Sequence, residues 1–190
     1  MTARTHDAFA FASLVTVAAF YPPETLSVAT LFTSLIGNVV GALTPDLDQA
    51  SNRLWDLLPV GNIVGKIFRP LLLGHRTLSH SILGGLVYYK LLEFVLPKIL
   101  NPDYVNINIV FGSIMIGFVS HLIADSLTKE GIPLFFPFKI KIGIPPFSFF
   151  RVTTGSFIEK GIVLPGVAVY LVWLVNFKKE VLLNVVKLLN

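Results

Sequence analysis

Five apolar stretches constrain what this chain can fold into more than any other feature of its sequence. They cover residues 8–20, 26–43, 78–96, 105–127 and 161–177. About 20 apolar residues in a helix cross the hydrocarbon core of a bilayer. The mean hydropathy of +0.74 also departs strongly from that of a soluble protein. We therefore expect an all-α, polytopic membrane helical bundle with four to five transmembrane helices, plus amphipathic segments at the interface.

The whole chain, residues 1–190, is expected to form one membrane-embedded domain in which residues 161–190 are a peripheral last helix and tail. The first apolar stretch resembles that of a signal peptide, but Tyr21-Pro22-Pro23 is not a small-residue cleavage site, so we expect the stretch to be retained. The sequence has no cysteine. Any metal must therefore be held by imidazole and oxygen ligands.

The polar segments between the apolar stretches alternate between two sides of the membrane. The side that holds the N-terminus carries ten basic residues and the other side four, which places the first side in the cytoplasm by the positive-inside rule. The ten are Arg4, Arg53, Lys66, Arg69, Arg76, Lys129, Lys139, Lys141, Arg151 and Lys160; the four are Lys98, Lys178, Lys179 and Lys187. The predicted location is the inner or plasma membrane.

Two segments on the cytoplasmic side have interfacial patterns. Residues 53–73 predict an amphipathic helix in the headgroup plane, and residues 133–151, rich in phenylalanine and proline, predict an irregular or short-strand lid. The net charge of +4 favours anionic lipid headgroups as partners in so apolar a chain, and no nucleic acid is expected. A small-molecule or lipid substrate fits a site at this interface. The oligomeric state stays open.

Seven histidines and aspartates fall at the cytoplasmic ends of the predicted helices. In an extended loop, Asp46 and Asp48 point to one side and can grip a cation. His121 and Asp125 lie one helical turn apart, where they can share a metal. The others are His6, His75 and His80. Each has an ordinary alternative: solvated loop acids, interfacial histidines, an exposed terminal histidine, or a helix-ending aspartate bonded to Ser126 or Thr128.

Local signals predict the neighbouring helix ends and one ion pair. Thr25 or Ser27 can cap the second helix. Thr77 or Ser79 can cap the third, which places His75 in the loop and His80 in the first turn. Lys90 and Glu93, three residues apart, predict a structural ion pair rather than a proton relay.

Five short motifs together resemble a family of membrane-bound, metal-dependent hydrolases of prokaryotes, which includes LexA-regulated, inner-membrane-associated members. The motifs are TH at residues 5–6, PDLD at 45–48, HRTLSHS at 75–81, HLIADSLTKEG at 121–131 and TGSFIE at 154–159. The resemblance implies a metal centre, distantly like that of the all-helical zinc-dependent phospholipase C and nuclease group. By this resemblance, the conserved polar residues of the family fall on His6, Asp46, Asp48, His75, His80, His121 and Asp125, with Arg76, Ser81, Thr128 and Glu159 as neighbours.

The expected function is therefore that of a metal-dependent hydrolase acting on a phosphoester or lipid-linked substrate. The phospholipase group has more histidines, so one or two zinc ions are expected rather than three. The ion would acidify a water molecule, Asp48 or Asp125 would act as the general base, and Arg76 would stabilise developing negative charge. A metal or proton transporter and a non-catalytic lipid-binding adaptor are the alternatives from other classes.

Overall fold

The computed structural model describes residues 1–48, 77–138 and 140–189. Within these ranges the chain forms six α-helices and no named strand, which confirms the all-helical prediction for the described part. The helices are α1 (Ala3–Phe20), α2 (Val28–Leu43), α5 (Ile82–Ile99), α6 (Ile107–Ser126), α7 (Leu164–Phe177) and α8 (Lys179–Lys187). Shorter elements are η1 (Thr44–Asp48), η2 (Leu78–His80), η3 (Ser148–Phe150) and the π-helical turn η4 (Glu159–Val163).

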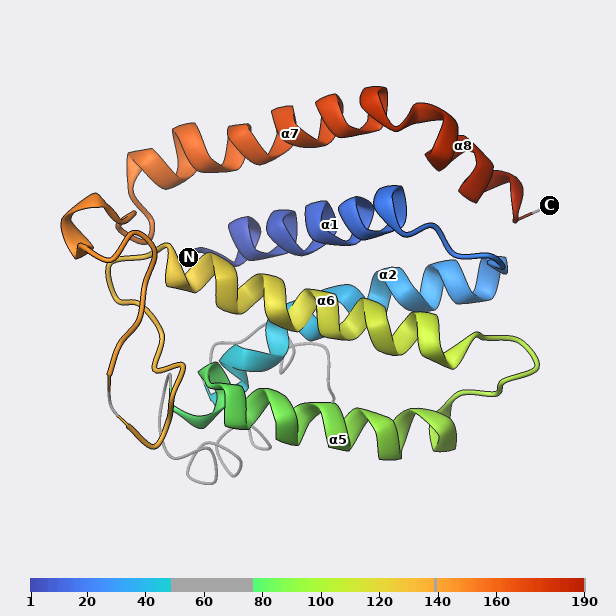
Figure 1. The fold of residues 1–190 in the computed structure, drawn as a ribbon, viewed down its shortest axis with the longest axis horizontal. Coiled ribbons are helices and arrows are strands. Elements are labelled where there is room, and N and C mark those ends of the chain that lie inside the picture. Colours follow the sequence, from blue (N-terminus) through green and yellow to red (C-terminus); the bar gives the residue numbers. More distant parts are fainter. Residues whose placement is uncertain (49–76, 139, 190) are drawn as a thin grey trace.

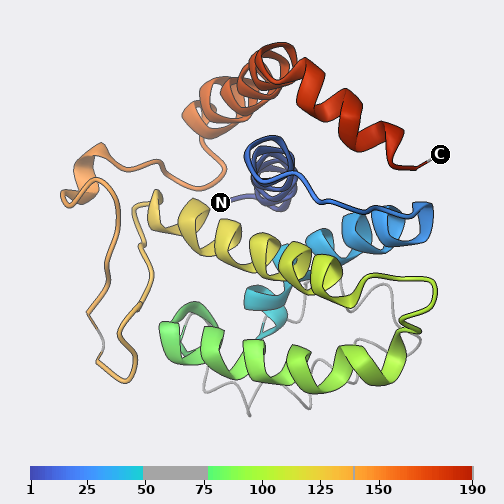
Figure 2. The ribbon, with the colours of Figure 1, turned by 45° about the vertical axis from the view of Figure 1, so that its right-hand side comes forward.

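Successive long helices run back and forth along the bundle, as Figures 1 and 2 show. Among the described residues, three helical segments are long and apolar enough to cross a membrane: Val28–Leu47, Ile107–Ser126 and Glu159–Phe177. The predicted stretches 8–20 and 78–96 do form helices, α1 and α5, but neither is among these three. The structure therefore supports three candidate spans, where the sequence predicted four to five.

Side-chain caps explain where several helices begin. Ser27 accepts a hydrogen bond from the Thr30 amide at 3.1 Å, which confirms one of the two caps predicted for α2. The prediction of Thr77 or Ser79 as the cap of the third helix is wrong: Ser81 caps α5 by accepting from the Gly84 amide at 3.0 Å. His80 consequently lies in η2, just before the helix, and not in its first turn.

The central contact of the bundle is the close approach of α2 and α6. A Cβ added at Gly41 would lie 2.0 Å from the carbonyl oxygen of Ile114, and one added at Gly117 would lie 2.0 Å from that of Asn38. Only glycine allows the two backbones to come so close, as at many helix contacts in membranes. The Asn38 amide group also donates to the Ser113 carbonyl at 3.1 Å. This contact fixes the position of α6 against the end of α2.

The chain after α6 is irregular, as predicted for the lid at residues 133–151. It is held by two isolated bridges, Ile132 with Ile142 and Thr128 with Val152. Large apolar side chains are exposed along it, including Phe147 and Phe149. In Figure 1 this segment lies at the end of the bundle that holds the N-terminus. The predicted amphipathic helix at residues 53–73 lies outside the described residues.

Candidate metal centre

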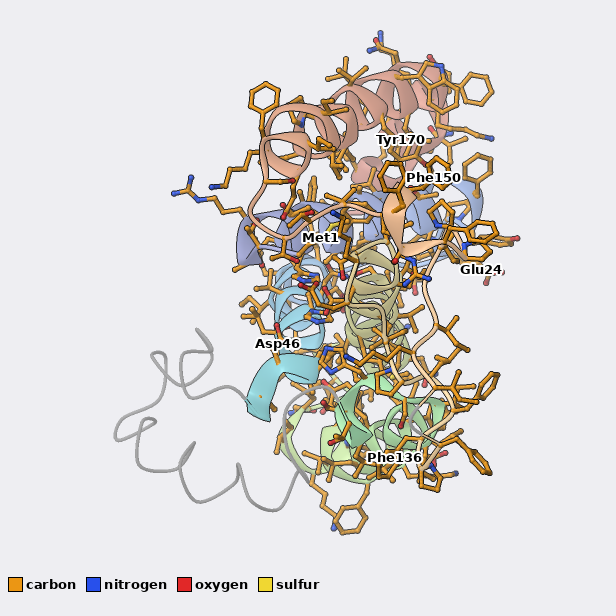
Figure 3. The ribbon with its side chains drawn as sticks, turned by 90° about the vertical axis from the view of Figure 1, so that its left-hand side faces the viewer. Met1, Glu24, Asp46, Phe136, Phe150 and Tyr170 are labelled. Carbon is orange, nitrogen blue, oxygen red and sulfur yellow. The ribbon has the colours of Figure 1, made fainter. Side chains whose placement is uncertain are left out.

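Five of the seven predicted ligands meet at one end of the bundle. They come from four separate elements, and Figure 3, a view onto that end, shows Asp46 on η1 below the start of α1. The five are His6 from α1, Asp46 from η1, His80 from η2, and His121 and Asp125 from α6. All except the half-buried Asp46 are buried. The predicted convergence on one face is therefore observed for these five side chains.

Asp125 lies at the middle of the group. Its Oδ1 is 3.2 Å from His6 Nε2, and its Oδ2 is 3.5 Å from His80 Nε2 and 3.8 Å from His121 Nε2. The amino nitrogen of Met1 also contacts Oδ1. The hydroxyl of Thr128 donates to the main-chain carbonyl of Asp125 at 2.7 Å. The Asp125 carboxylate thus faces three imidazoles and the amino group of Met1.

The far nitrogens of two imidazoles are held by hydrogen bonds. His121 Nδ1 lies 2.6 Å from the carbonyl oxygen of Ala42, so Nδ1 must carry the proton that it donates. His80 Nδ1 lies 3.0 Å from the Ser79 hydroxyl. Both rings direct Nε2 toward the centre. This arrangement, in which one ring nitrogen is oriented by a partner and the other faces inward, is typical of histidines that bind metals.

Asp46 closes the centre from the side of η1. Its Oδ1 lies 3.5 Å from His80 Nε2 and 3.8 Å from His121 Nε2. Pro45 precedes it and is itself fully buried. The extended loop predicted for Asp46 and Asp48 is wrong, because both residues lie in the 3-10 helix η1; the side chain of Asp48 is outside the described residues. His75 and Arg76 are outside them as well.

The separations between these ligand atoms suit a metal ion, and two of the atoms make no hydrogen bond. Ligands about 2.0–2.1 Å from a tetrahedral zinc ion are roughly 3.3 Å apart, close to the 3.5 and 3.8 Å separations measured here. His121 Nε2 and Asp46 Oδ1 are buried and make no hydrogen bond. Buried polar atoms without a hydrogen bond are costly, and a cation would satisfy both. The donor set of imidazole and carboxylate suits zinc and similar divalent ions.

The described residues provide two overlapping triads of ligand atoms, each within 4.8 Å of one another. One is His6, Asp46 and His121; the other is His80, His121 and Asp125. Both depend on His121, whose Nδ1 is already bonded to Ala42. A single Nε2 lone pair binds one ion, so these residues suit one metal. A second would need a bridging carboxylate or ligands from outside the described ranges, where His75 lies.

Glu159 anchors the first turn of α1 to the last span. Its fully buried carboxylate accepts hydrogen bonds from the Thr2 amide at 2.6 Å, the Thr5 hydroxyl at 2.7 Å and the Gly155 amide at 2.6 Å. Thr5 directly precedes His6, whose ring stacks on that of His121 with centroids 3.8 Å apart. Sequence reasoning named Glu159 only as a neighbour. Its position in the TGSFIE motif was the one available signal.

Three smaller predictions can also be compared with the geometry. Lys90 and Glu93 form the predicted ion pair at 2.6 Å, with both side chains exposed. The Asp125 carboxylate contacts the histidines, whereas Thr128 bonds its main-chain oxygen, so the alternative of a merely helix-ending aspartate does not describe this site. The first helix, expected from the apolar stretch at residues 8–20, is longer than that stretch: α1 begins at Ala3, so His6 lies within it.

Comparison with known proteins gives the chain a family. Residues 1–183 match the family model described as YdjM inner membrane protein. The uncharacterized protein YvsG of Bacillus subtilis is 34% identical over 167 residues, which cover 87% of this chain and 89% of that protein. Inner membrane protein YdjM of Escherichia coli is 29% identical over 108 residues, 56% of this chain and 50% of YdjM. No solved structure matches. The chain belongs to the YdjM inner membrane protein family.

Proposed function

We propose that this membrane protein is a metal-dependent hydrolase whose centre comprises His6, Asp46, His80, His121 and Asp125. The observation that carries the proposal is the inward-facing Nε2 of His121, which is buried without a hydrogen bond while its Nδ1 is held by Ala42. A purely structural histidine at this depth would use both nitrogens. Asp46 Oδ1, equally buried and unbonded, supports the same interpretation.

The protein's own residues would divide the work as follows. His80 and His121 would bind the ion through Nε2, with Asp46 and Asp125 supplying oxygen ligands. Such an ion, when bound, supplies hydroxide near neutral pH. Asp48, or Asp125 where it is not used as a ligand, would take up a proton as the general base, and Arg76 would stabilise negative charge that develops on the substrate.

The substrate is proposed to be a phosphoester, either lipid-linked or at the cytoplasmic membrane surface. The described site residues all lie at one end of the candidate spans, beside the lid with its exposed phenylalanines. A site at that depth is within reach of lipid headgroups. The excess of basic residues at the same end supports the cytoplasmic orientation and favours anionic substrates.

A hydrolysis screen tests the proposal. Wild-type protein in detergent or nanodiscs is assayed with zinc and with chelator against soluble phosphodiesters and phospholipids. The variants are His121→Ala and, as a control, Lys90→Ala, which removes an exposed lysine that pairs with Glu93 and lies over the Tyr89 ring. We expect metal-dependent turnover by the wild type and by Lys90→Ala, and none by His121→Ala. Bound metal without turnover of any substrate would contradict the hydrolase proposal and favour metal transport.

A further inference from the structure

A groove of about 560 Å³ lies between α1 and α7, and its first lining residue on α1 is Phe9, one helical turn after His6. Figures 1 and 2 both show α7 extended along α1. Phe9 and Ser13 line the groove from α1, and Gly166 lines it from α7. At the far end, the Thr16 hydroxyl lies 2.9 Å from the hydroxyl of Tyr170. The volume is within the roughly 300–1,000 Å³ of pockets that bind small ligands.

The groove continues the face of α1 on which His6 lies. Phe9, Ser13 and Thr16 follow His6 at three, seven and ten residues, which is the spacing of one helix face. Thr16 is therefore about 15 Å from His6 along the helix axis. That length is half of the ~30 Å hydrocarbon thickness of a bilayer. The groove thus begins one turn beyond His6 and ends, at Thr16 and Val17, at about the depth of one leaflet from it.

The surroundings of the groove favour an apolar occupant from the membrane. The candidate span Glu159–Phe177 is only 6% buried inside the protein, and Val169 and Val172 on α7 are exposed. The groove beside such a helix opens onto acyl chains rather than water. Most of the residues that line the groove are apolar. A Cβ atom added at Gly166 would meet nothing within 4 Å. Space at this position is therefore available to a ligand.

We propose that this groove receives an acyl chain of a lipid substrate and so selects long-chain lipid esters. The inference rests on the proposed function, because it places the ester headgroup at the metal centre beside His6. A lipid in this orientation keeps its charged group at the level of the buried histidines and its chain within the leaflet. The selected class is then a membrane phospholipid rather than a soluble phosphodiester.

A pair of glycine substitutions isolates the groove from the rest of the fold. Gly166→Leu places a side chain in the open space of the groove, and Gly112→Leu places the same side chain in α6, where an added Cβ also meets nothing within 4 Å. Neither substitution creates a backbone clash, so both variants should fold. A misfit of one methylene in an apolar pocket changes an enzyme's discrimination between substrates roughly 10–200-fold, and the leucine side chain adds four carbons.

The assay compares a phospholipid with two 16-carbon chains and the soluble bis(p-nitrophenyl) phosphate. We expect Gly166→Leu to lose about tenfold or more of kcat/KM for the phospholipid and to keep its rate with the soluble ester. Gly112→Leu should keep both rates. Equal rates of Gly166→Leu and wild type with the phospholipid, or an equal loss with both substrates, would overturn the inference.

Photo-crosslinking supplies a readout that does not depend on turnover. A phospholipid with a diazirine in its acyl chain is added to wild-type and variant protein in vesicles, and labelled residues are mapped by mass spectrometry. Labels on Phe9 and Val167 that disappear in Gly166→Leu, while Val169 on the outer face stays labelled, would support the groove even if no hydrolysis is found. Failure to label Phe9 and Val167 would refute it whatever the enzymatic result.

Discussion

Replacing Gly41 by alanine should both destabilise the bundle and weaken the metal centre. The added Cβ would lie 2.0 Å from the carbonyl oxygen of Ile114, whereas ordinary van der Waals contact begins at 3.4 Å. The two helices must therefore separate by up to about 1.4 Å, the difference between these two distances. Because the obstacle is backbone rather than a flexible side chain, no rotamer change can relieve it.

The magnitude follows from known costs of overpacking. Extra methyl groups in packed interiors cost about 1–3 kcal/mol, and a backbone clash belongs at the upper end. Alanine recovers up to about 1 kcal/mol of helix propensity. Gly112→Ala gains the same propensity and meets nothing within 4 Å. At roughly 2–4 °C per kcal/mol for a chain of this size, Gly41→Ala should melt about 6–12 °C below Gly112→Ala.

The metal centre should respond because Ala42 follows Gly41 directly. Its carbonyl accepts from His121 Nδ1 at 2.6 Å, and a separation of the helices by about 1 Å would break that bond. Loss of the partner that orients a metal-binding histidine typically costs 10–100-fold in affinity. Thermal unfolding in detergent and zinc titration measure both effects. Equal melting temperatures and equal zinc affinity for Gly41→Ala and Gly112→Ala would refute this reasoning.

Three further outcomes follow from the same contacts. Glu159→Ala should weaken zinc binding by releasing the first turn of α1 with His6, whereas Glu159→Asp should bind zinc more tightly than Glu159→Ala. A zinc affinity equal to that of the wild type in both variants would contradict an anchoring role. Gly84→Ala, whose Cβ would lie 1.9 Å from the Leu78 carbonyl oxygen, should displace His80 and reduce zinc affinity, as isothermal titration can test. Chelation should lower the melting temperature of the wild type but not of His121→Ala, since roughly 2.7 kcal/mol of stabilisation accompanies metal at 100 times its Kd.

The sequence was informative where the structure depends on local patterns. Apolar stretches located the helices, and counting membrane crossings placed His6, Asp46, His80, His121 and Asp125 at one end, where the structure finds them. The i, i+4 spacing of His121 and Asp125 also predicted their shared face. These inferences needed only helical periodicity and alternation of sides.

The features that were missed depend on contacts between remote segments. α1 begins at Ala3, ahead of the apolar stretch at residues 8–20, and Glu159, more than 150 residues later, accepts hydrogen bonds from its first turn. The cap at Ser81 was missed because Thr77, Ser79 and Ser81 are all acceptable cap residues, and the tight approach of Gly84 to Leu78 decides among them. The stacking of His6 on His121 likewise requires α1 and α6 to be packed together.

The central claim is that His121 belongs to a buried centre that binds a divalent metal. Its most direct test is the metal content of protein purified without added chelator. Inductively coupled plasma mass spectrometry measures it for wild type, His121→Ala and Lys90→Ala. We predict one or two zinc ions per chain in the wild type and in Lys90→Ala, and a loss of at least one in His121→Ala. Equal stoichiometric metal in His121→Ala and wild type, or no metal in the wild type after zinc loading, would contradict the account.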